Sequence, residues 1–485
     1  MDASSFKKIN FGESSAEKEK AHSPNLLLEG FLDERGDINE VIAGARFLIY
    51  GQKGSGKSAI CSRVELIADS RNLSVKTYTL ERLNYNAFEG MDTKKEAPEI
   101  KNTRSWEMVL HTALLGMYSN DPNLKSISGK KKAKQVIKEL QRLNILPIDD
   151  IYSLVKKVSK SELTANVEVI KYKNETQKKF DYTKLYDNLR VAVNDSQPSK
   201  KCILFIDGLD SVITTRDNQK NVLSGLLRAS KIINEEMQTN SINVKIVVLC
   251  RTDLLNMLSD PNKQKIIDDY GLELNWYQHG LEHININLIK LLNLRAKTSL
   301  EKEIDIFSEF FPKTTGNKET FKFILDYTRY IPRDLIRLMN EIKKMYVKPM
   351  QKNHFITAIK EYSSNYLYGE IRDELLGIAE SEKQVEDIFN LLSEMKKYRT
   401  SQVELQNKAK ELGIDVNVEN MLPLLFNIGA IGNVKVINGK DMYSFKFRER
   451  RTVFSPKDEI VIHLALQNLL KVRGGYENVK EIDYD

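Results

Sequence analysis

The sequence of 485 residues predicts an α/β fold built on a parallel sheet, and three observations carry this prediction. A glycine-rich segment, residues 51–58, lies between a short apolar run and a stretch with the apolar spacing of a helix. Two further apolar runs, Cys202–Ile206 and Val244–Cys250, each lead into charged or polar residues. The first of these runs has five apolar residues in a row, which is typical of a strand buried on both faces, as in a parallel sheet.

The glycine-rich segment, GQKGSGKS, fits the phosphate-binding pattern G-x-x-x-x-G-K-[ST] at each fixed position. Phe47–Tyr50 before it predicts a strand, and residues 59–67 after it predict a helix. In such a P-loop the backbone N–H groups and the helix N-terminus face the phosphates. We expect Lys57 to reach the β- and γ-phosphates of ATP and Ser58 to hold Mg²⁺. The expected nucleotide contacts are Gly51, Gly54, Ser55, Gly56, Lys57, Ser58 and Ala59.

The second apolar run ends in Asp207-Gly208-Leu209-Asp210. A carboxylate at the C-terminal end of a neighbouring strand lies beside the phosphate loop, so Asp207 is expected to complete the Mg²⁺ shell. The alternative is a buried strand that ends in an acidic turn. The third run ends in Arg251 and Thr252, either of which could touch the γ-phosphate or position the attacking water.

Composition indicates a soluble protein with a mildly basic charge. The net charge is +7, with 29% charged and 41% hydrophobic residues, which allows a nucleic-acid partner without requiring one. No apolar run approaches the roughly 18 residues of a membrane span, and the first twenty residues do not resemble a signal peptide. Three scattered cysteines, Cys61, Cys202 and Cys250, favour free thiols in a reducing cytoplasm.

The chain divides by pattern into four parts. These are a polar N-terminal segment (1–24), an ATPase core (25–275) with a helical insertion at about 84–199, a helical lid (276–365) and a winged-helix domain (366–485). We expect helices over residues 26–32 and 281–294. The lysine-rich run at 129–134 is either a solvated surface or a nucleic-acid contact.

The expected lid contains a helix that begins at Pro332, a residue well suited to the first turn. Arg333 and Arg337 are four residues apart and therefore share one face of that helix. An arginine on a lid helix that folds over the γ-phosphate would report whether ATP or ADP is bound. The alternative is a solvated helix with surface arginines.

The last part predicts three helices, at 383–395, 400–412 and 418–426, and a hairpin that turns at Asn438-Gly439. Basic residues around the hairpin exceed acidic ones by four, which suits phosphate contact. The third helix nevertheless has no lysine or arginine to reach base edges, which favours a protein-packing or regulatory wing over DNA reading. The basic residues are Lys435, Lys440, Lys446, Arg448, Arg450 and Arg451, and the acidic ones are Asp441 and Glu449.

Five elements of the sequence together resemble the STAND and origin-recognition branch of the AAA+ ATPases. They are the phosphate loop, the strand ending at Asp207, the polar strand end at Arg251, the Ile331-Pro332-Arg333 element and the winged helix. More narrowly, residues 11–17 and 47–60 are similar to a bacterial group of stand-alone P-loop ATPases, some of which are found near anti-phage defence genes. The resemblance covers most of the chain outside residues 84–199.

The resemblance implies a slow ATPase that works as a conformational switch. Gly208 stands where AAA+ motors usually carry a glutamate after the magnesium aspartate, and Asp210 is the residue expected to orient water. Tyr330 stands where STAND proteins usually have the glycine of a Gly-x-Pro motif. The expected cofactors are ATP and Mg²⁺. The expected catalytic residues are Lys57, Asp207, Asp210, Arg251 and Arg333.

Such a switch would control a separate protein effector, in anti-phage defence, with a homo-oligomer as a further expected partner. The alternative is a DNA-associated AAA+-like ATPase that loads on or clamps duplex DNA. A third reading is a nucleotide-binding scaffold without turnover. Salt-dependent duplex binding separates the first two functions, and phosphate release excludes the third.

Overall fold

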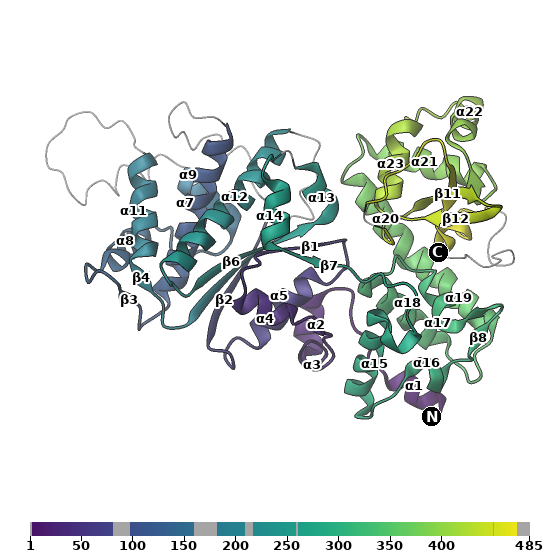
Figure 1. The fold of residues 1–485 in the computed structure, drawn as a ribbon, viewed down its shortest axis with the longest axis horizontal. Coiled ribbons are helices and arrows are strands. Elements are labelled where there is room, and N and C mark those ends of the chain that lie inside the picture. The colour runs from purple at the N-terminus through teal and green to yellow at the C-terminus, as the bar shows by residue number, and fades with distance from the viewer. Residues whose placement is uncertain are drawn as a thin grey trace. The chain divides into compact units, whose positions relative to one another are not determined.

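The computed structural model describes residues 2–80, 98–159, 182–208, 217–258, 260–449 and 451–472. The chain forms two compact units (Figure 1). The sheet unit consists of Asp33–Lys53 and Lys57–Leu274. The helical unit consists of Met1–Leu32, Gly54–Gly56 and Asn275–Asp485, so the tip of the phosphate loop is grouped with it.

The sheet unit confirms the predicted parallel sheet, which has five strands within the described residues, in the order β2-β5-β6-β1-β7. Every neighbouring pair in this order is parallel. Strands β5 and β6 occupy interior positions and their apolar residues are buried, as the five apolar residues in a row predicted for β5. The strand bounds are β1 Leu48–Gly51, β2 Leu73–Thr79, β5 Lys201–Asp207, β6 Val244–Arg251 and β7 Gly271–Leu274.

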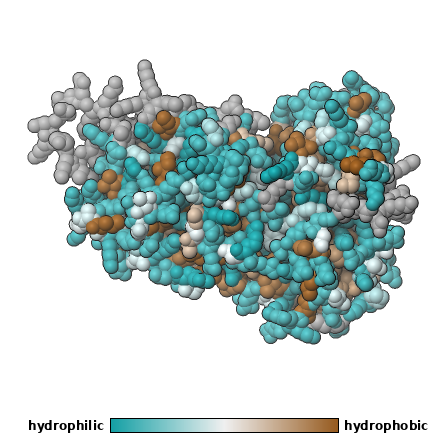
Figure 2. All heavy atoms as spheres, viewed as in Figure 1, coloured by the Kyte–Doolittle hydropathy of each residue, from teal (hydrophilic) through white to brown (hydrophobic). Residues whose placement is uncertain are grey.

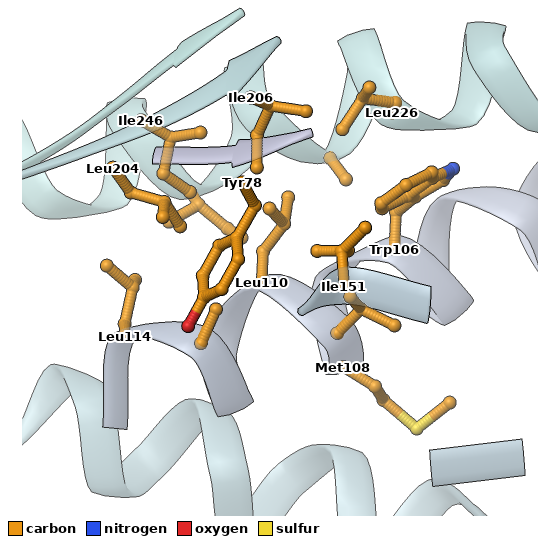
Figure 3. Close-up of a cluster of buried hydrophobic side chains, with 14 of the residues drawn as sticks. Tyr78, Trp106, Met108, Leu110, Leu114, Ile151, Leu204, Ile206, Leu226 and Ile246 are labelled. Carbon is orange, nitrogen blue, oxygen red and sulfur yellow. The ribbon is translucent and has the colours of Figure 1, made fainter. Parts of the chain in front are cut away.

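Helices cover both faces of this sheet. Figure 1 shows α4 (Asp37–Ala43) and α5 (Lys57–Leu66) on one face, and α7 (Pro98–Ser119) and α12 (Asp217–Thr239) on the other. The side chains labelled in Figure 3 come from the strands, from α7 and α12 and, for Ile151, from the start of α9, and they form one apolar cluster. Within it, the Trp106 indole N–H donates to the carbonyl of Val222 at 2.7 Å, which satisfies the ring's polar atom.

The predicted helical insertion is confirmed in its described part. It contains α7, followed by α8 (Lys132–Arg142), α9 (Ile151–Ser159) and α11 (Tyr182–Asn194). The short strands β3 (Lys125–Ser126) and β4 (Ser196–Gln197) pair with each other. Two further helices of the sheet unit follow β6, namely α13 (Thr252–Met257) and α14 (Lys263–Tyr270).

The helical unit corrects two sequence expectations. The polar N-terminal segment contains two helices for which no prediction was made, α1 (Ala3–Lys8) and α2 (Ala16–His22). The helix expected over 26–32 is α3 (Pro24–Leu28), which ends earlier. The helix expected over 281–294 is α15, which runs from Asn287 to Leu300. It begins later than expected because residues His283–Asn285 form a separate 3₁₀ turn and Ile286 after them is extended.

A buried ion pair explains why the N-terminal segment is ordered. Arg295 on α15 donates to both carboxylate oxygens of Glu19 on α2, at 2.7 and 3.0 Å. The Phe6 ring of α1 stacks on Tyr346, with ring centroids 4.1 Å apart. Arg295 lies 276 residues after Glu19, and Tyr346 lies 346 − 6 = 340 residues after Phe6, so no local sequence pattern predicts either contact.

The rest of the predicted lid is helical. Within it, Thr314–Thr315 (β8) and Lys318–Glu319 (β9) form a small antiparallel pair. The helices are α16 (Ile306–Phe310), α17 (Thr320–Leu325), α18 (Pro332–Met345), α19 (Lys352–Tyr362) and α20 (Tyr368–Leu376), with a π-helical turn at Ser363–Leu367 between the last two.

The winged-helix prediction is confirmed. Helices α21 (Glu382–Glu394), α22 (Gln402–Leu412) and α23 (Val418–Asn427) precede the hairpin of β11 (Ile431–Ile437) and β12 (Lys440–Ser444). Asn438 and Gly439 both have positive φ, as the tight hairpin turn requires. The sequence did not predict the strands β10 (Arg399–Thr400) and β13 (Glu459–Ile462), which extend the wing to the order β10-β13-β11-β12, or the short α24 (Leu464–Gln467).

The visible surface is largely hydrophilic, with hydrophobic side chains in small groups (Figure 2). Across the described part of the chain, no helix combines the length and apolar character needed to cross a bilayer.

Candidate nucleotide-binding site

The phosphate loop connects the end of β1 at Gly51 to the start of α5 at Lys57. Gly54 and Gly56 have φ values of +82° and +98°, in the left-handed region that favours glycine. A Cβ at Gly54 would also lie 3.0 Å from the Cβ of Arg333. Glycine at both positions therefore permits the turn, and at Gly54 it also leaves room for the close approach of Arg333.

The polar groups of the loop suit a bound polyphosphate. The Lys57 ammonium is buried and donates to the carbonyls of Gly51 and Gln52, at 3.2 and 3.0 Å. The hydroxyl of Ser55 is buried without a hydrogen-bond partner among the described residues. A cation held at the loop and an unsatisfied donor within it both fit phosphate oxygens. Ala59 lies in the first turn of α5, next to these groups.

The proposed metal ligands are in contact with each other. Ser58 donates from Oγ to Oδ2 of Asp207 at 2.8 Å. The other oxygen of Asp207 accepts the N–H of Gly208 at 2.7 Å, and Gly208 has φ +79°. A hydroxyl and a carboxylate are oxygen ligands of the kind that Mg²⁺ prefers. Asp210, the residue expected to orient water, lies outside the described residues.

Arg251 ends β6 directly opposite Gly51 in the parallel register. Its side chain is 4% exposed and forms an ion pair with Asp253, to which Nε donates at 2.9 Å. The strand end therefore brings Arg251 beside the phosphate loop, as the sequence suggested, with its charge partly neutralised by Asp253. Thr252 begins α13 instead of extending the strand.

The two lid arginines have different surroundings within the helical unit. The backbone N–H of Arg333 donates to the carbonyl of Gly54 at 3.3 Å, and its guanidinium lies 3.5 Å from the carboxylate of Glu370. Arg337 instead stacks over the Tyr366 ring, 5.3 Å from the ring centroid. Only the first of this pair is therefore brought to the loop tip.

Trp276 was missed by the sequence analysis. Its indole N–H donates to the carbonyl of Ser55 at 2.8 Å, within the helical unit. The available signal was one aromatic residue shortly after the alternating segment Leu272-Glu273-Leu274, which by itself is too common to indicate a site.

The expectation that the basic residues around the hairpin suit phosphate contact, which requires them to be exposed, is partly wrong. The Arg448 side chain is 7% exposed and lies 3.3 Å from the carboxylate of Asp326. Lys446 is half-buried and donates to the carbonyl of Thr452 at 2.8 Å. Lys440 and Arg451 are exposed, whereas Arg450 lies outside the described residues. Arg448 is drawn inward because three aromatic rings, those of Tyr330, Phe445 and Phe447, lie within 6 Å of its guanidinium.

Solved structures with low similarity cover most of the chain. They include Cdc6p from Pyrobaculum aerophilum (14% identity, 97% of this chain, 96% of that one, TM-score 0.34). The Orc1 protein of Aeropyrum pernix in complex with DNA is 15% identical; the match covers 93% of this chain and 96% of that one, with a TM-score of 0.39. The Thermotoga maritima RuvB Holliday junction branch migration motor is 13% identical; the match covers 92% of this chain and 96% of that one, with a TM-score of 0.29. At these TM-scores the fold assignment rests on the strand order and register of this chain.

Two sequence similarities are more direct. Over 483 residues the chain is 20% identical to the putative transposon gamma-delta 80.3 kDa protein of Escherichia coli (strain K12). The match covers 93% of this chain and 66% of that protein, so the chain spans slightly less than two thirds of the relative's length. Residues 286–368, from α15 through the π-helical turn, match the family model of the FunZ-associated C-terminal helical domain, and in this part the chain is similar to that family.

Proposed function

We propose that this protein is an ATPase of the AAA+ class that binds ATP with Mg²⁺, hydrolyses it slowly and acts as a molecular switch for a separate protein effector. The observation that carries the proposal is the hydrogen bond between Ser58 and Asp207, one residue from the buried Lys57. Two sequence-distant oxygen ligands and a cation thus meet at a loop built for phosphates.

Each side chain has a distinct role in this proposal. Lys57 exchanges its two carbonyl acceptors for phosphate oxygens, which carry full negative charge and bind an ammonium more strongly. Ser58 and Asp207 supply the oxygen ligands of Mg²⁺. When bound, Mg²⁺ neutralises charge that develops on the phosphates during transfer.

Slow turnover follows from the residue after Asp207. Gly208 has no side chain to act on water, and its left-handed backbone directs the chain away from a regular strand. We assign the orientation of water to Asp210. Arg251 and Arg333 are assigned to sensing the γ-phosphate, and the contact of Arg333 with Gly54 supports the second assignment more strongly. Because hydrolysis is slow, the protein stays in its ATP-bound state long enough for that state to favour or disfavour binding of the effector.

The role in anti-phage defence and the separate effector rest on the resemblance described above, as does the proposed homo-oligomer. Steady-state phosphate release by the purified full chain with Mg²⁺ and ATP tests the enzyme. The Lys57→Ala variant is the control for contaminating activity. Equal release by the two proteins would contradict the assignment. Nucleotide-dependent co-purification of one protein from the native host would support the effector.

A second candidate function is that of a DNA-associated ATPase, and one observation favours it. Helix α8 buries an apolar face and exposes a basic one. It begins without an acidic residue in its first turn, although acidic residues are favoured at that end. The exposed lysines on and before α8 are Lys130, Lys131, Lys132, Lys134 and Lys138.

Charge reversal on α8 tests this second function. The Lys131→Glu, Lys134→Glu, Lys138→Glu variant should lose duplex affinity and show a flatter salt dependence if these lysines contact phosphates. A control with Lys352→Glu and Lys360→Glu changes exposed lysines of α19. Equal duplex binding by both variants would exclude α8 as a DNA contact.

A further inference from the structure

Tyr330 has an unusual backbone for its residue type. Its φ is +51°, in the left-handed region, where a bulky residue costs about 1 kcal/mol or more. It immediately precedes Ile331 and Pro332, which begin α18. Such a conformation persists only where surrounding contacts impose it.

The Tyr330 side chain is held on several sides, all within the helical unit. Its hydroxyl donates to Asp326 at 2.9 Å. Its ring meets Tyr277 edge-on, with centroids 5.1 Å apart, and stacks on Phe447 at 6.2 Å with an interplanar angle of 17°. The Arg448 guanidinium lies 5.5 Å from the ring centroid. Phe447 and Arg448 come from the winged-helix domain, so the ring joins that domain to the start of α18.

The residues just before Tyr330 are attached to the winged-helix domain as well. Arg329 is buried and donates to Asp334 at 2.9 and 3.1 Å and to Glu374 at 2.9 Å. The carbonyl of Thr328 accepts a hydrogen bond from Nε2 of His463, at 3.2 Å. This segment therefore cannot shift by itself without leaving buried charges unpaired, which costs several kcal/mol.

The residues just after Tyr330 reach the phosphate loop. The positions that a Cβ on Gly54 would approach most closely belong to Arg333 and Ile331, at 3.0 and 3.1 Å. The N–H of Arg333 donates to the Gly54 carbonyl. Within three residues the chain thus passes from the winged-helix contacts to the loop tip. The left-handed Tyr330 reverses the direction of the chain just before the extended Ile331 and Pro332, where α18 begins.

We propose that Tyr330 is a positioning residue that couples the phosphate loop to the winged-helix domain. Its backbone aims Arg333 at Gly54, and its ring transmits a displacement of that contact to Phe447 and Arg448. The inference rests on the proposed ATP-dependent switch and names the coupling element within it. Glycine at this position would make the same turn without strain, but would have no ring to transmit a displacement.

Three variants separate the backbone role from the ring role. Tyr330→Gly keeps the turn and loses the ring, Tyr330→Ala loses the ring and keeps the strain, and Tyr330→Phe loses only the hydroxyl. Two readouts are measured on the full chain: affinity for a fluorescent ATP analogue, and the rate of tryptic cleavage after Lys446 and Arg448 with and without Mg²⁺ and ATP.

The wild type should show a nucleotide-dependent cleavage rate, and Tyr330→Phe should retain it. Tyr330→Gly should bind the analogue within about threefold of the wild type but lose the nucleotide dependence of cleavage. Tyr330→Ala should in addition bind about tenfold more weakly, because nothing then opposes the strain.

Persistent nucleotide-dependent cleavage in Tyr330→Gly would overturn the proposal, as would its loss in Tyr330→Phe. If Tyr330→Ala fails to fold, the other two variants still decide. Failure of the proposed function is recognised separately, because the wild type would then bind the analogue no better than Lys57→Ala.

Discussion

The Ser58 hydroxyl donates a hydrogen bond to Asp207 Oδ2 at 2.8 Å, although the two residues lie 149 positions apart. Strand β6 separates the strands that lead to them, so they are not neighbours in the sheet. They meet because Asp207 is the last residue of β5 and Ser58 lies in the first turn of α5, which follows β1, so both stand at the carboxyl ends of parallel strands. Sites in parallel α/β sheets form at this edge for the same reason.

Lys57→Ala should abolish or strongly weaken ATP binding while leaving the fold intact. The change removes the ammonium expected to contact the phosphates, and the protein contacts that it removes are two hydrogen bonds, to the carbonyls of Gly51 and Gln52. Titration with a fluorescent ATP analogue and far-ultraviolet circular dichroism measure the two effects. Lys53→Ala, at a variable position of the same loop, is the matched control. Wild-type affinity in Lys57→Ala would contradict the site.

Asp207→Ala should eliminate Mg²⁺-dependent phosphate release. The substitution removes the carboxylate that faces Ser58, so one of the two expected metal ligands is missing. Phosphate release measured across a Mg²⁺ titration should become independent of the metal. A Mg²⁺ dependence like that of the wild type would show that the metal is held elsewhere.

Asp210→Ala should bind ATP normally and hydrolyse it more slowly. The prediction follows from Gly208, which places no carboxylate next to Asp207. Single-turnover phosphate release measures the chemical step apart from product release. An unchanged rate would assign the orientation of water to another residue, and would leave nucleotide binding at Lys57 unaffected.

Arg448→Ala should destabilise the protein and leave DNA binding unchanged. The Arg448 guanidinium lies 3.3 Å from the carboxylate of Asp326, with side-chain exposures of 7% and 2%. Asp326 also accepts from Lys318 at 3.0 Å, so the substitution removes one of two cations beside a buried carboxylate and costs about 2 kcal/mol. Urea unfolding measures the loss. Exposed Lys440→Ala is the control and should change the unfolding free energy by less than about 0.5 kcal/mol. A salt-sensitive loss of duplex affinity in Arg448→Ala would instead favour the DNA-associated function.

His463 should make the protein sensitive to acid. Burial lowers the pKa of His463 to about 4, and Nδ1 accepts the N–H of Ala465 while Nε2 donates to Thr328, so both nitrogens suit the neutral ring. Nearby Asp334 raises this pKa, whereas Arg329 and Arg448 lower it. The unfolded state gains a proton near pH 6.5 and the folded state does not, so stability falls between pH 6.5 and 4.

The loss from His463 amounts to at most about 3 kcal/mol. Buried His111, whose pKa burial also lowers to about 4, adds a loss of the same sign. The free energy of unfolding of the wild type and of His463→Gln, measured from pH 7 to 4, checks this contribution. The variant should show a shallower decline. Parallel curves for the two proteins would contradict the buried neutral histidine.

Local patterns in the sequence were sufficient for much of the fold and the centre of the site. The phosphate loop, the apolar strands β5 and β6, the capping box of Ser401 and Glu404 and the Asn438-Gly439 hairpin turn were all predicted. Each depends on residues within a few positions of one another. The physical preferences involved, such as positive φ at glycine or burial on both faces, are therefore visible in a short window.

The tertiary structure alone decided the relationships between distant residues. It paired Glu19 with Arg295, which orders helices where the sequence suggested a polar segment, and it buried Arg448 where the sequence suggested an exposed basic edge. It also imposed a left-handed backbone on Tyr330. A buried charge is stable only with its partner, and a strained residue only with its surrounding contacts. Because those partners lie tens to hundreds of residues away, only the folded chain reveals them.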